Sequence, residues 1–274
     1  MTVSHSGKPA TPALCALALL ACAGMPHPAP AQADDAAVGG NLALTSDYIY
    51  RGVSESDGHA ALQADLHAAT AGGMFAGVWA STRDSHLEPG AAGELQLYVG
   101  RRLALSAEWS ATLSGRADHL FGGSQQASDD YQEIAAAFSW LDLCTLSVAA
   151  IPSAARYAYR PVGYETYAYQ PQGSETYAYQ RLGRSAAFVA DGSAQWLITG
   201  ALYVTGGAGY YYAGGRSAER LDTVGYAYGN AGLAYERGRW RLDVGYFVAQ
   251  RAAAELFPYP LANRRTAATL SWQF

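Results

Sequence analysis

The last thirteen residues of the chain, 262–274, have the pattern of one amphipathic β-strand. Counting back from Phe274 in steps of two gives an apolar face, which carries Trp272, Leu270, Ala268 and Thr266, and a polar face, which carries Gln273, Ser271, Thr269, Ala267 and Arg265. An apolar face that ends in aromatic residues is typical of the last strand of a bacterial outer-membrane β-barrel. The strand therefore predicts a transmembrane β-barrel, with a soluble β-sandwich as the alternative. It also predicts that the barrel assembly machinery recognises the strand through Phe274.

The first 33 residues have the composition of a signal peptide. Lys8 precedes an apolar run over residues 13–25, which is too short to cross a bilayer, and small residues follow at Ala31 and Ala33. We therefore expect export, cleavage after Ala33, and a mature chain of residues 34–274 that forms the barrel in the outer membrane.

An alternative cleavage site would leave a lipid on the chain. Residues 19–22, Leu-Leu-Ala-Cys, resemble a lipobox, which would place the lipid on Cys22. The site after Ala33 lies nearer the first expected strand and has the small residues that signal cleavage requires. Cleavage there leaves Cys144 as the one cysteine of the mature chain, so we expect no disulfide within it.

The mature chain divides into about twelve strand candidates, each near the ten residues that a tilted strand needs to cross a bilayer. They lie near residues 40–51, 59–70, 73–82, 93–101, 106–118, 130–141, 143–154, 185–197, 200–212, 224–236, 239–250 and 263–274. Short links alternate with longer polar or Gly-rich links, as in barrels with short periplasmic turns and longer external loops. No mature run reaches the roughly 18 apolar residues of a membrane helix, so the backbone polar groups must be satisfied by closing an antiparallel sheet. The expected fold class is all-β.

Alternation with period two assigns one parity of each strand to lipid and the other to the lumen. On the first strand, Leu42, Leu44, Tyr48 and Tyr50 are expected to face lipid. The polar parity supplies the lumen-facing candidates, which are Asp47, Arg51, Asp65, Glu94, Glu108, Arg116, Arg239, Arg241, Asp243 and Arg265. Because they carry both signs of charge, the lumen lacks the one-sided field that selects cations or anions.

Two functions of different classes fit this pattern. The first is a channel for passive diffusion of small polar solutes with weak charge selectivity, which the polar lumen favours. The second is a closed structural or adhesive barrel that acts through its external loops. Twelve strands lie between the small packed barrels and the large open porins, so the strand number does not decide between them.

Several segments of the mature chain resemble a known family. These are residues 40–57, GNLALTSDYIYRGVSESD, then 60–63, AALQ, and 75–81, FAGVWAS, with further pieces at 93–100, GELQLYVG, and 130–133, DYQE, and with Gly-Tyr pairs at 209–210 and 245–246. In these pieces the chain resembles Gcw_chp, a family of uncharacterised proteobacterial outer-membrane proteins. The resemblance implies a porin-like barrel. It implies no substrate and no binding residue.

A tandem repeat of ten residues occupies positions 153–182, between the seventh and eighth expected strands, and is expected to form the longest external loop. Its Tyr-Ala-Tyr units supply candidate loop-binding residues, which are Tyr157, Tyr159, Tyr167, Tyr169, Tyr177 and Tyr179. Replication slippage that lengthened a tolerant loop explains the repeat without a function. A tyrosine surface that stacks on sugars, or two strands prolonged as a hairpin, are the alternatives.

The sequence gives no sign of an enzyme, a metal site or a cofactor. The mature histidines, which are His59, His67, His86 and His119, lack metal-ligand spacing, and the alternation of Asp84, His86 and Glu88 fits a solvated loop. The glycines of 206–209 lack the Gly-Lys-Ser/Thr of a phosphate loop. A net charge of −5 argues against nucleic acid as a partner, which leaves outer-membrane lipid and the assembly machinery.

Overall fold

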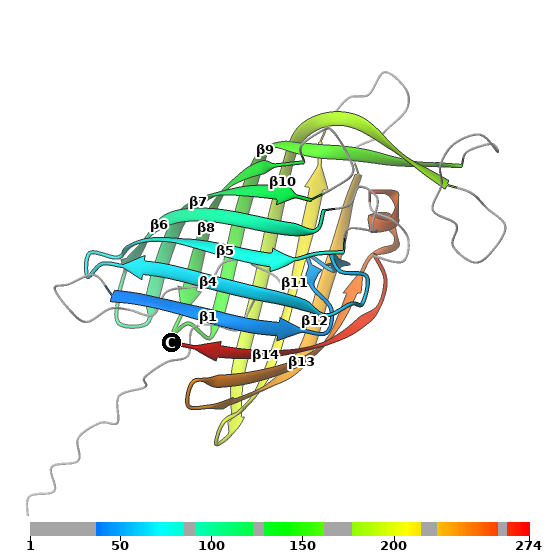
Figure 1. Cartoon of the computed structure of the whole chain (residues 1–274). Coiled ribbons are helices and arrows are strands. Elements are labelled where there is room, and N and C mark those ends of the chain that lie inside the picture. The colour runs from blue at the N-terminus through cyan, green and yellow to red at the C-terminus, as the bar shows by residue number, and fades with distance from the viewer. Residues whose placement is uncertain (1–36, 85–90, 123–128, 162–176, 215–223, 257–261) are drawn as a thin grey trace, which may run out of the picture.

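A computed structural model describes residues 37–84, 91–122, 129–161, 177–214, 224–256 and 262–274 (Figure 1). The expected signal peptide, residues 1–33, lies outside the described residues. So do Tyr167 and Tyr169 of the repeat, and His86 and Glu88.

Within the described residues, twelve antiparallel strands close into one barrel, in which each strand pairs with its neighbours in the chain and β1 pairs with β14. The strands are β1 (Ala37–Thr45), β4 (Ala61–Ala69), β5 (Met74–Thr82), β6 (Gly93–Ala104), β7 (Trp109–Phe121), β8 (Tyr131–Trp140), β9 (Cys144–Pro161), β10 (Tyr177–Thr199), β11 (Leu202–Ala213), β12 (Val224–Arg237), β13 (Trp240–Ala249) and β14 (Arg265–Gln273). The prediction of an antiparallel barrel of about twelve strands is confirmed. Among the described residues, no helix is long and apolar enough to span a membrane.

The closing pair sets the register of the barrel. Leu44 of β1 lies opposite Leu270 of β14 on one side and opposite Leu62 of β4 on the other. All three side chains are exposed on the outer face, whereas the flanking Ala43 and Thr45 are buried inside. Closure leaves no free sheet edge, so each spanning strand finds its backbone partners within the sheet.

The outer face is apolar along its length and aromatic near one end. Large exposed side chains such as Leu113, Ile134, Val148 and Leu233 point outward from the middle of their strands. At the end with the short turns, aromatic rings stack on the same face, with Trp109 against Phe138 at 4.8 Å and Trp272 against Phe274 at 5.1 Å between ring centroids. This combination of an apolar band and an aromatic girdle is the outer surface of a membrane-spanning barrel.

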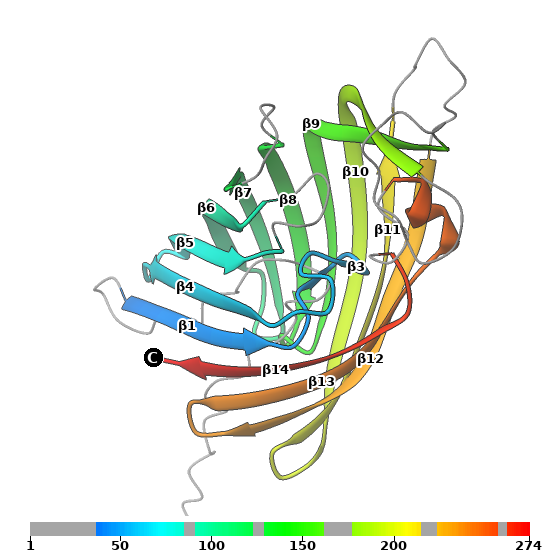
Figure 2. The same ribbon diagram turned by 45° about the vertical axis from the view of Figure 1, so that its right-hand side comes forward.

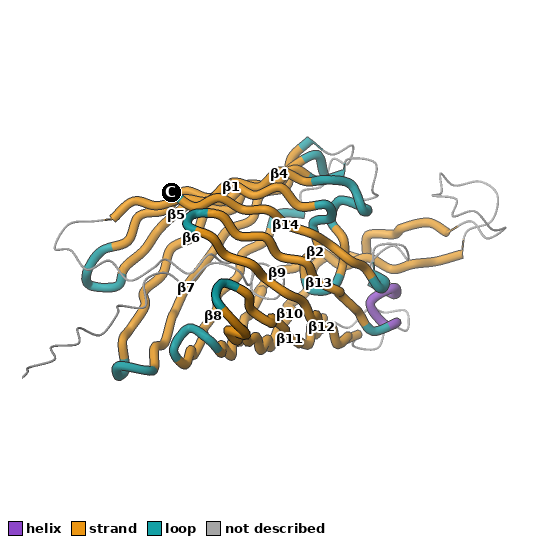
Figure 3. Tube along the Cα trace, turned by 90° about the horizontal axis from the view of Figure 1, so that it is seen from below, coloured by secondary structure: helices purple, strands orange, loops and turns teal. Residues whose placement is uncertain are grey.

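The two ends of the barrel differ. One end carries short turns such as 70–73, 105–108 and 238–239, together with the start of β1 and the end of β14. The other end carries the longer connections and the short helix η1 (Arg251–Glu255), which Figure 3 shows beside the barrel rim. This end is called the loop end below.

Strands β9 and β10 are longer than the others and run past the loop end as a paired arm (Figures 1 and 3). Their pairing continues to Tyr177 opposite Pro161, with register shifts near Gly183 and Ser185. This backbone arrangement is the one expected if the repeat prolongs two strands as a hairpin.

The first strand is shorter than the sequence pattern indicates. The sequence pattern predicts one strand over residues 40–51. In the structure β1 ends at Thr45, and the chain then turns into the barrel to form the hairpin of β2 (Ile49–Tyr50) and β3 (Val53–Ser54). The prediction that Tyr48 and Tyr50 face lipid is therefore wrong. Tyr48 is only 6% exposed and packs on Trp79, which also points inward.

Candidate functional site: a hairpin inside the barrel

The connection from β1 to β4, residues 46–60, enters the lumen from the loop end instead of lying outside it (Figure 2). We call it the inward hairpin. Its tip is a two-residue turn in which Arg51 and Gly52 both have positive φ, 51° and 79°. Such a turn joins two strands tightly and favours glycine at its second position. A Cβ on Gly52 would lie 2.8 Å from Cβ of Tyr228, so the tip touches the barrel wall.

Asp47 fixes the base of the inward hairpin. Its carboxylate accepts hydrogen bonds from the hydroxyl groups of Ser54 and Ser56 and from the backbone N–H of Gly58. It also forms an ion pair with Arg265 of β14, 3.0 Å between Nη1 and Oδ2. These bonds hold both ends of the hairpin together and attach them to the last strand.

The tip carries a buried charge cluster that reaches the opposite wall. Arg51 donates to Glu133 of β8 at 2.8 Å, and Arg116 of β7 donates to the same carboxylate at 3.0 Å. Arg116 also donates to the hydroxyl of Tyr50 and to that of Tyr131, at 3.2 Å for the latter. Because the ion pairs are almost fully buried, removal of one partner would leave an uncompensated charge, which costs several kcal/mol.

A second cluster binds the flank of the inward hairpin to β6. Arg83 forms ion pairs with Glu55 of the hairpin and with Glu94, the latter at 2.8 Å, and the Tyr48 hydroxyl donates to Glu94 at 3.3 Å. Burial raises the pKa of Glu55 to about 7. The positive charge of Arg83 lowers this pKa, whereas the negative charges of Glu94 and Asp47 raise it further. Near neutral pH, Glu55 is therefore divided between its charged and neutral forms.

Apolar packing completes the contact on the side of the later strands. Val53 belongs to a buried cluster with Ile151 of β9, Val189 of β10, Tyr226 of β12 and Leu256 beside η1. With the polar contacts to β6, β7, β8 and β14, the hairpin meets the wall on opposite sides. It therefore crosses the lumen near the loop end.

The sequence-derived lumen candidates fall into four groups. Asp65, Glu94, Arg116 and Arg241 are buried on strands, Asp47 and Arg51 are buried on the inward hairpin, and Asp243 and Arg265 are partly buried on strands; Glu108 and Arg239 are exposed in the short turns before β7 and β13. The structure thus brings Asp47, Arg51, Glu94, Arg116 and Arg265 together at the hairpin and leaves the two turn residues outside the lumen wall.

A separate polar group lies nearer the short turns. Arg241 forms ion pairs with Glu236 and with Asp243, 2.9 Å for the latter, and lies over the ring of Tyr203. Its Nη1 also lies 3.4 Å from the amide oxygen of Gln195. The polar lining of the lumen therefore continues from the hairpin toward the end with the short turns.

Sequence reasoning missed several inward groups that complete these clusters. Glu133 and Asp118 are both buried. Asp118 follows Arg116 by two residues on the same face of β7, and its Oδ2 lies 3.2 Å from Nε of Arg116. The period-two rule predicts Asp118 from Arg116, because residues two apart on a strand share a face. Glu133 follows Tyr131 at the same spacing on β8. Among the described residues, no three His, Cys, Asp or Glu side chains come together as a metal site.

A closed antiparallel barrel with an apolar outer face and a polar lumen is a porin-like barrel. The chain belongs to the Gcw_chp family, described as bacterial proteins of unknown function, whose model matches residues 30–188. The resemblance inferred from the sequence is thereby confirmed. No curated protein sequence matches the chain.

Several solved barrels are similar in structure. The NanC porin is 11% identical, with 87% of this chain and 99% of that chain covered and a TM-score of 0.49. The KdgM porin, solved in complex with disordered oligogalacturonate, is 8% identical, with 88% and 98% covered and a TM-score of 0.45. OpdL of Pseudomonas aeruginosa is 14% identical, with 78% and 59% covered and a TM-score of 0.38.

Proposed function

We propose that this protein is a channel in the bacterial outer membrane for passive diffusion of small polar solutes, narrowed at its loop end by the inward hairpin. The observation that carries the proposal is that a connecting loop, rather than the strands themselves, crosses a polar lumen. A loop can move without breaking the ladder of a closed sheet, since its backbone bonds are not part of that ladder. The hairpin is thus a constriction that can yield to a solute.

Weak charge selectivity is part of the proposal. Each arginine at the hairpin has an acidic neighbour in the lumen, as in the pairs Arg51 with Glu133, Arg83 with Glu94, and Arg265 with Asp47. Paired charges produce little net field along a pore, so neither cations nor anions are concentrated strongly.

Location and assembly belong to the same proposal. Export by a cleaved signal peptide, residues 1–33, would deliver the chain to the periplasm. Recognition by the barrel assembly machinery through Phe274 fits a terminal ring that is exposed on the outer face beside Trp272.

A closed structural or adhesive barrel is the second candidate. The packing of Val53 among residues of β9, β10 and β12 favours it, because an apolar contact of this kind holds the hairpin in place without any solute. In that case the external loops would carry the function.

Conductance in planar bilayers tests the proposal. The N–H of Gly58 lies 3.2 Å from the Asp47 carboxylate, so residues 48–57 can be replaced by a short Gly-Ser link without moving β1 or β4. We expect small, weakly selective conductance from the wild type and a larger value after replacement. Removal of residues 163–182 from the outer arm is the matched control and should leave conductance unchanged. No conductance from either the wild type or the hairpin replacement would reject the channel in favour of the closed barrel.

A further inference from the structure

A row of inward-facing side chains crosses four neighbouring strands beside the inward hairpin. Asn41 of β1 lies opposite Asp65 of β4, and Asp65 lies opposite Trp79 of β5. Trp79 in turn lies opposite Gln96 of β6. All four residues are buried, with between 2% and 6% of their surface exposed. We call these four residues the lumen row.

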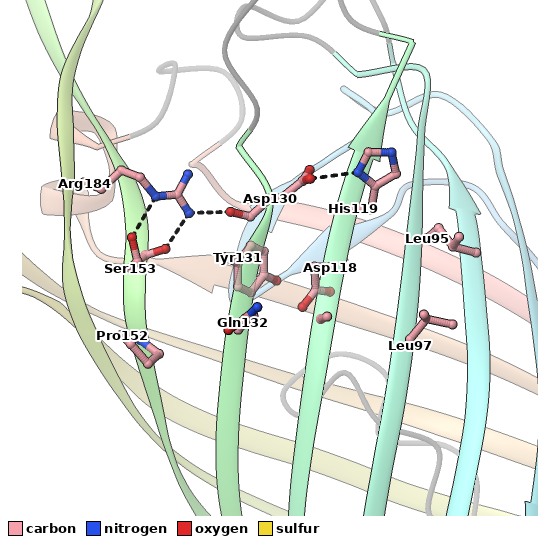
Figure 4. A pocket seen from close by; sticks show the side chains of 11 residues that line it. Leu95, Leu97, Asp118, His119, Asp130, Tyr131, Gln132, Pro152, Ser153 and Arg184 are labelled. Atoms are coloured by element: carbon pink, nitrogen blue, oxygen red, sulfur yellow. Dashed lines mark hydrogen bonds and ion pairs between the residues drawn. The ribbon is translucent and has the colours of Figure 1, made fainter.

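Two acceptors in the lumen row have no donor. Oδ1 of Asn41 and Oε1 of Gln96 are buried, and neither has a hydrogen-bond partner among the described residues. The amide nitrogen of Gln96 donates to Asp118 of β7 at 2.6 Å, so the amide oxygen is turned away from that carboxylate. Beyond Gln96 the same line across the wall continues through Asp118 to Tyr131 of β8 (Figure 4). Because buried polar groups are nearly always paired, two open carbonyl oxygens in one row indicate a ligand that donates hydrogen bonds.

The charged groups around the lumen row are already paired. Asp65 accepts a hydrogen bond from the hydroxyl of Tyr98 at 2.7 Å and lies 2.6 Å from Nδ1 of His67. Asp118 forms an ion pair with Arg116 at 3.2 Å. The open acceptors are therefore neutral amides, and a carboxylate on the ligand would meet the negative charge of Asp65. The ligand that fits the row is uncharged.

Tyr48 of the inward hairpin covers the aromatic member of the lumen row. Its ring lies against that of Trp79, with 5.7 Å between ring centroids and 59° between the ring planes. Its hydroxyl donates to Glu94 at 3.3 Å, and Glu94 shares a face of β6 with Gln96, two residues away. Tyr48 thus presents an apolar ring and a hydroxyl group to the wall, a combination that a sugar ring also has. A solute that stacks on Trp79 must displace Tyr48.

We infer that the lumen row binds an uncharged sugar, and that Tyr48 occupies the same place while the inward hairpin is docked. This inference rests on the proposed channel and names its class of solute. The apolar face of one sugar ring stacks on Trp79, while hydroxyl groups donate to Asn41 and Gln96. These two amides are three strands apart, about 14 Å at about 4.8 Å per strand, so linked rings fit better than a single ring. Because the sugar and the docked hairpin exclude each other, the solute itself opens the constriction.

Isothermal titration calorimetry on the full chain, purified in a detergent without a sugar headgroup, tests the inference. The probes are maltose and maltobionate, which is the same disaccharide with one end oxidised to a carboxylate. We expect maltose to bind at least about tenfold more tightly than maltobionate. Tyr48→Ala should bind maltose about tenfold more tightly than the wild type does, because the competing ring is gone. Equal binding of the two probes, or no binding of maltose to either protein, would overturn the inference.

Two matched variants locate the bound sugar. Asn41→Leu keeps the size of the side chain but removes the open carbonyl oxygen, so it should weaken maltose binding about three- to tenfold, the effect of one neutral hydrogen bond. Asn230→Leu makes the same change on the inner face of β12 and should leave binding unchanged. Heat-modifiable migration on gels checks that each variant is folded. Unchanged binding in Asn41→Leu would refute the site, and unchanged binding in Tyr48→Ala would refute the competition with the hairpin.

The calorimetric test is independent of conductance, so the sugar site and the channel can fail separately. A folded protein that binds maltose without conducting would reject the channel and retain the site. A protein that conducts but binds maltose in neither the wild type nor Tyr48→Ala would reject the site alone.

Discussion

Gly52 at the tip of the inward hairpin offers a direct test of whether docking of the hairpin closes the lumen. The change is Gly52→Ala, which adds one methyl group and alters no charge. Its φ of +79° is a left-handed conformation, and an added Cβ would lie 2.8 Å from Cβ of Tyr228 and 3.1 Å from both Cβ of Ala249 and the carbonyl oxygen of Val248. These three atoms lie in or next to the backbone of the wall and cannot swing away as the end of a long side chain can.

Two costs add in the docked state. A non-glycine residue in the left-handed region costs about 1 to 2 kcal/mol. Relief of the contact with Tyr228 requires the tip to withdraw, and we estimate about 1 kcal/mol for it, as for mild overpacking. A total of about 2 to 3 kcal/mol raises the ratio of displaced to docked hairpin by roughly 30- to 150-fold. The barrel wall itself is unaffected, since β1 and β4 keep their pairing.

The assay is single-channel recording in planar bilayers, with heat-modifiable migration on gels as the check of folding. Gly58→Ala is the matched control, because its φ is +76° while an added Cβ meets only Nη1 of Arg265, at 3.5 Å. We expect longer or larger openings for Gly52→Ala than for wild type and Gly58→Ala. Identical traces from all three proteins, each fully folded, would show that the contact with the wall does not hold the hairpin across the lumen.

Three further predictions address facing, pH and the outer arm. Val244→Arg places a charge on the lipid face and should destabilise the folded barrel by about 2 to 4 kcal/mol in urea titrations in lipid, whereas Asp243→Arg should cost less; equal costs would contradict the assigned facing. Because burial raises the pKa of Glu55 from 4.5 to about 7, its neutral form favours docking, so docking is strongest at acid pH and weakens as pH rises through about 7. Conductance should therefore rise as the pH increases from about 4.5 to about 7, and Glu55→Gln should remove this pH dependence. A wild-type conductance that does not change with pH would contradict the prediction. Removal of residues 163–182 should leave barrel folding on gels intact, since the pairing of β9 with β10 from Gly183 onward remains; a protein that no longer folds would show that the arm is required.

The facing of the strands was predictable from short stretches of sequence. Leu242 and Val244 are exposed and Arg241 is buried, as period-two alternation requires, and the start of β12 at residue 224 agrees with the expected interval. The alternation is a property of the strand backbone, so five or six residues suffice to reveal it. The alternation is less informative where both faces of a strand are apolar. On β5, for example, the apolar side chains of Phe75 and Trp79 point inward.

The candidate site was only partly predictable. The sequence pattern correctly predicts that Asp47 and Arg51 face the lumen, but it predicts them on a spanning strand and predicts that the adjoining Tyr48 faces lipid. Tyrosine occurs both in membrane girdles and in buried polar clusters, so its identity does not distinguish the two. The alternating pattern runs past Thr45 without a break, which hides the point where the strand ends.

The sequence by itself determined the antiparallel barrel, the approximate number of strands and, for most strands, which parity meets lipid, because these depend on local periodicity and on the need to satisfy the backbone in a membrane. Only the tertiary structure decided that residues 46–60 fold into the lumen. The contacts that hold them come from distant positions, such as Glu133, 82 residues from Arg51, and Arg265, 218 residues from Asp47. Closure of the barrel brings these charges together, and their pairing inside it is what allows the charged residues of the loop to be buried without an uncompensated charge.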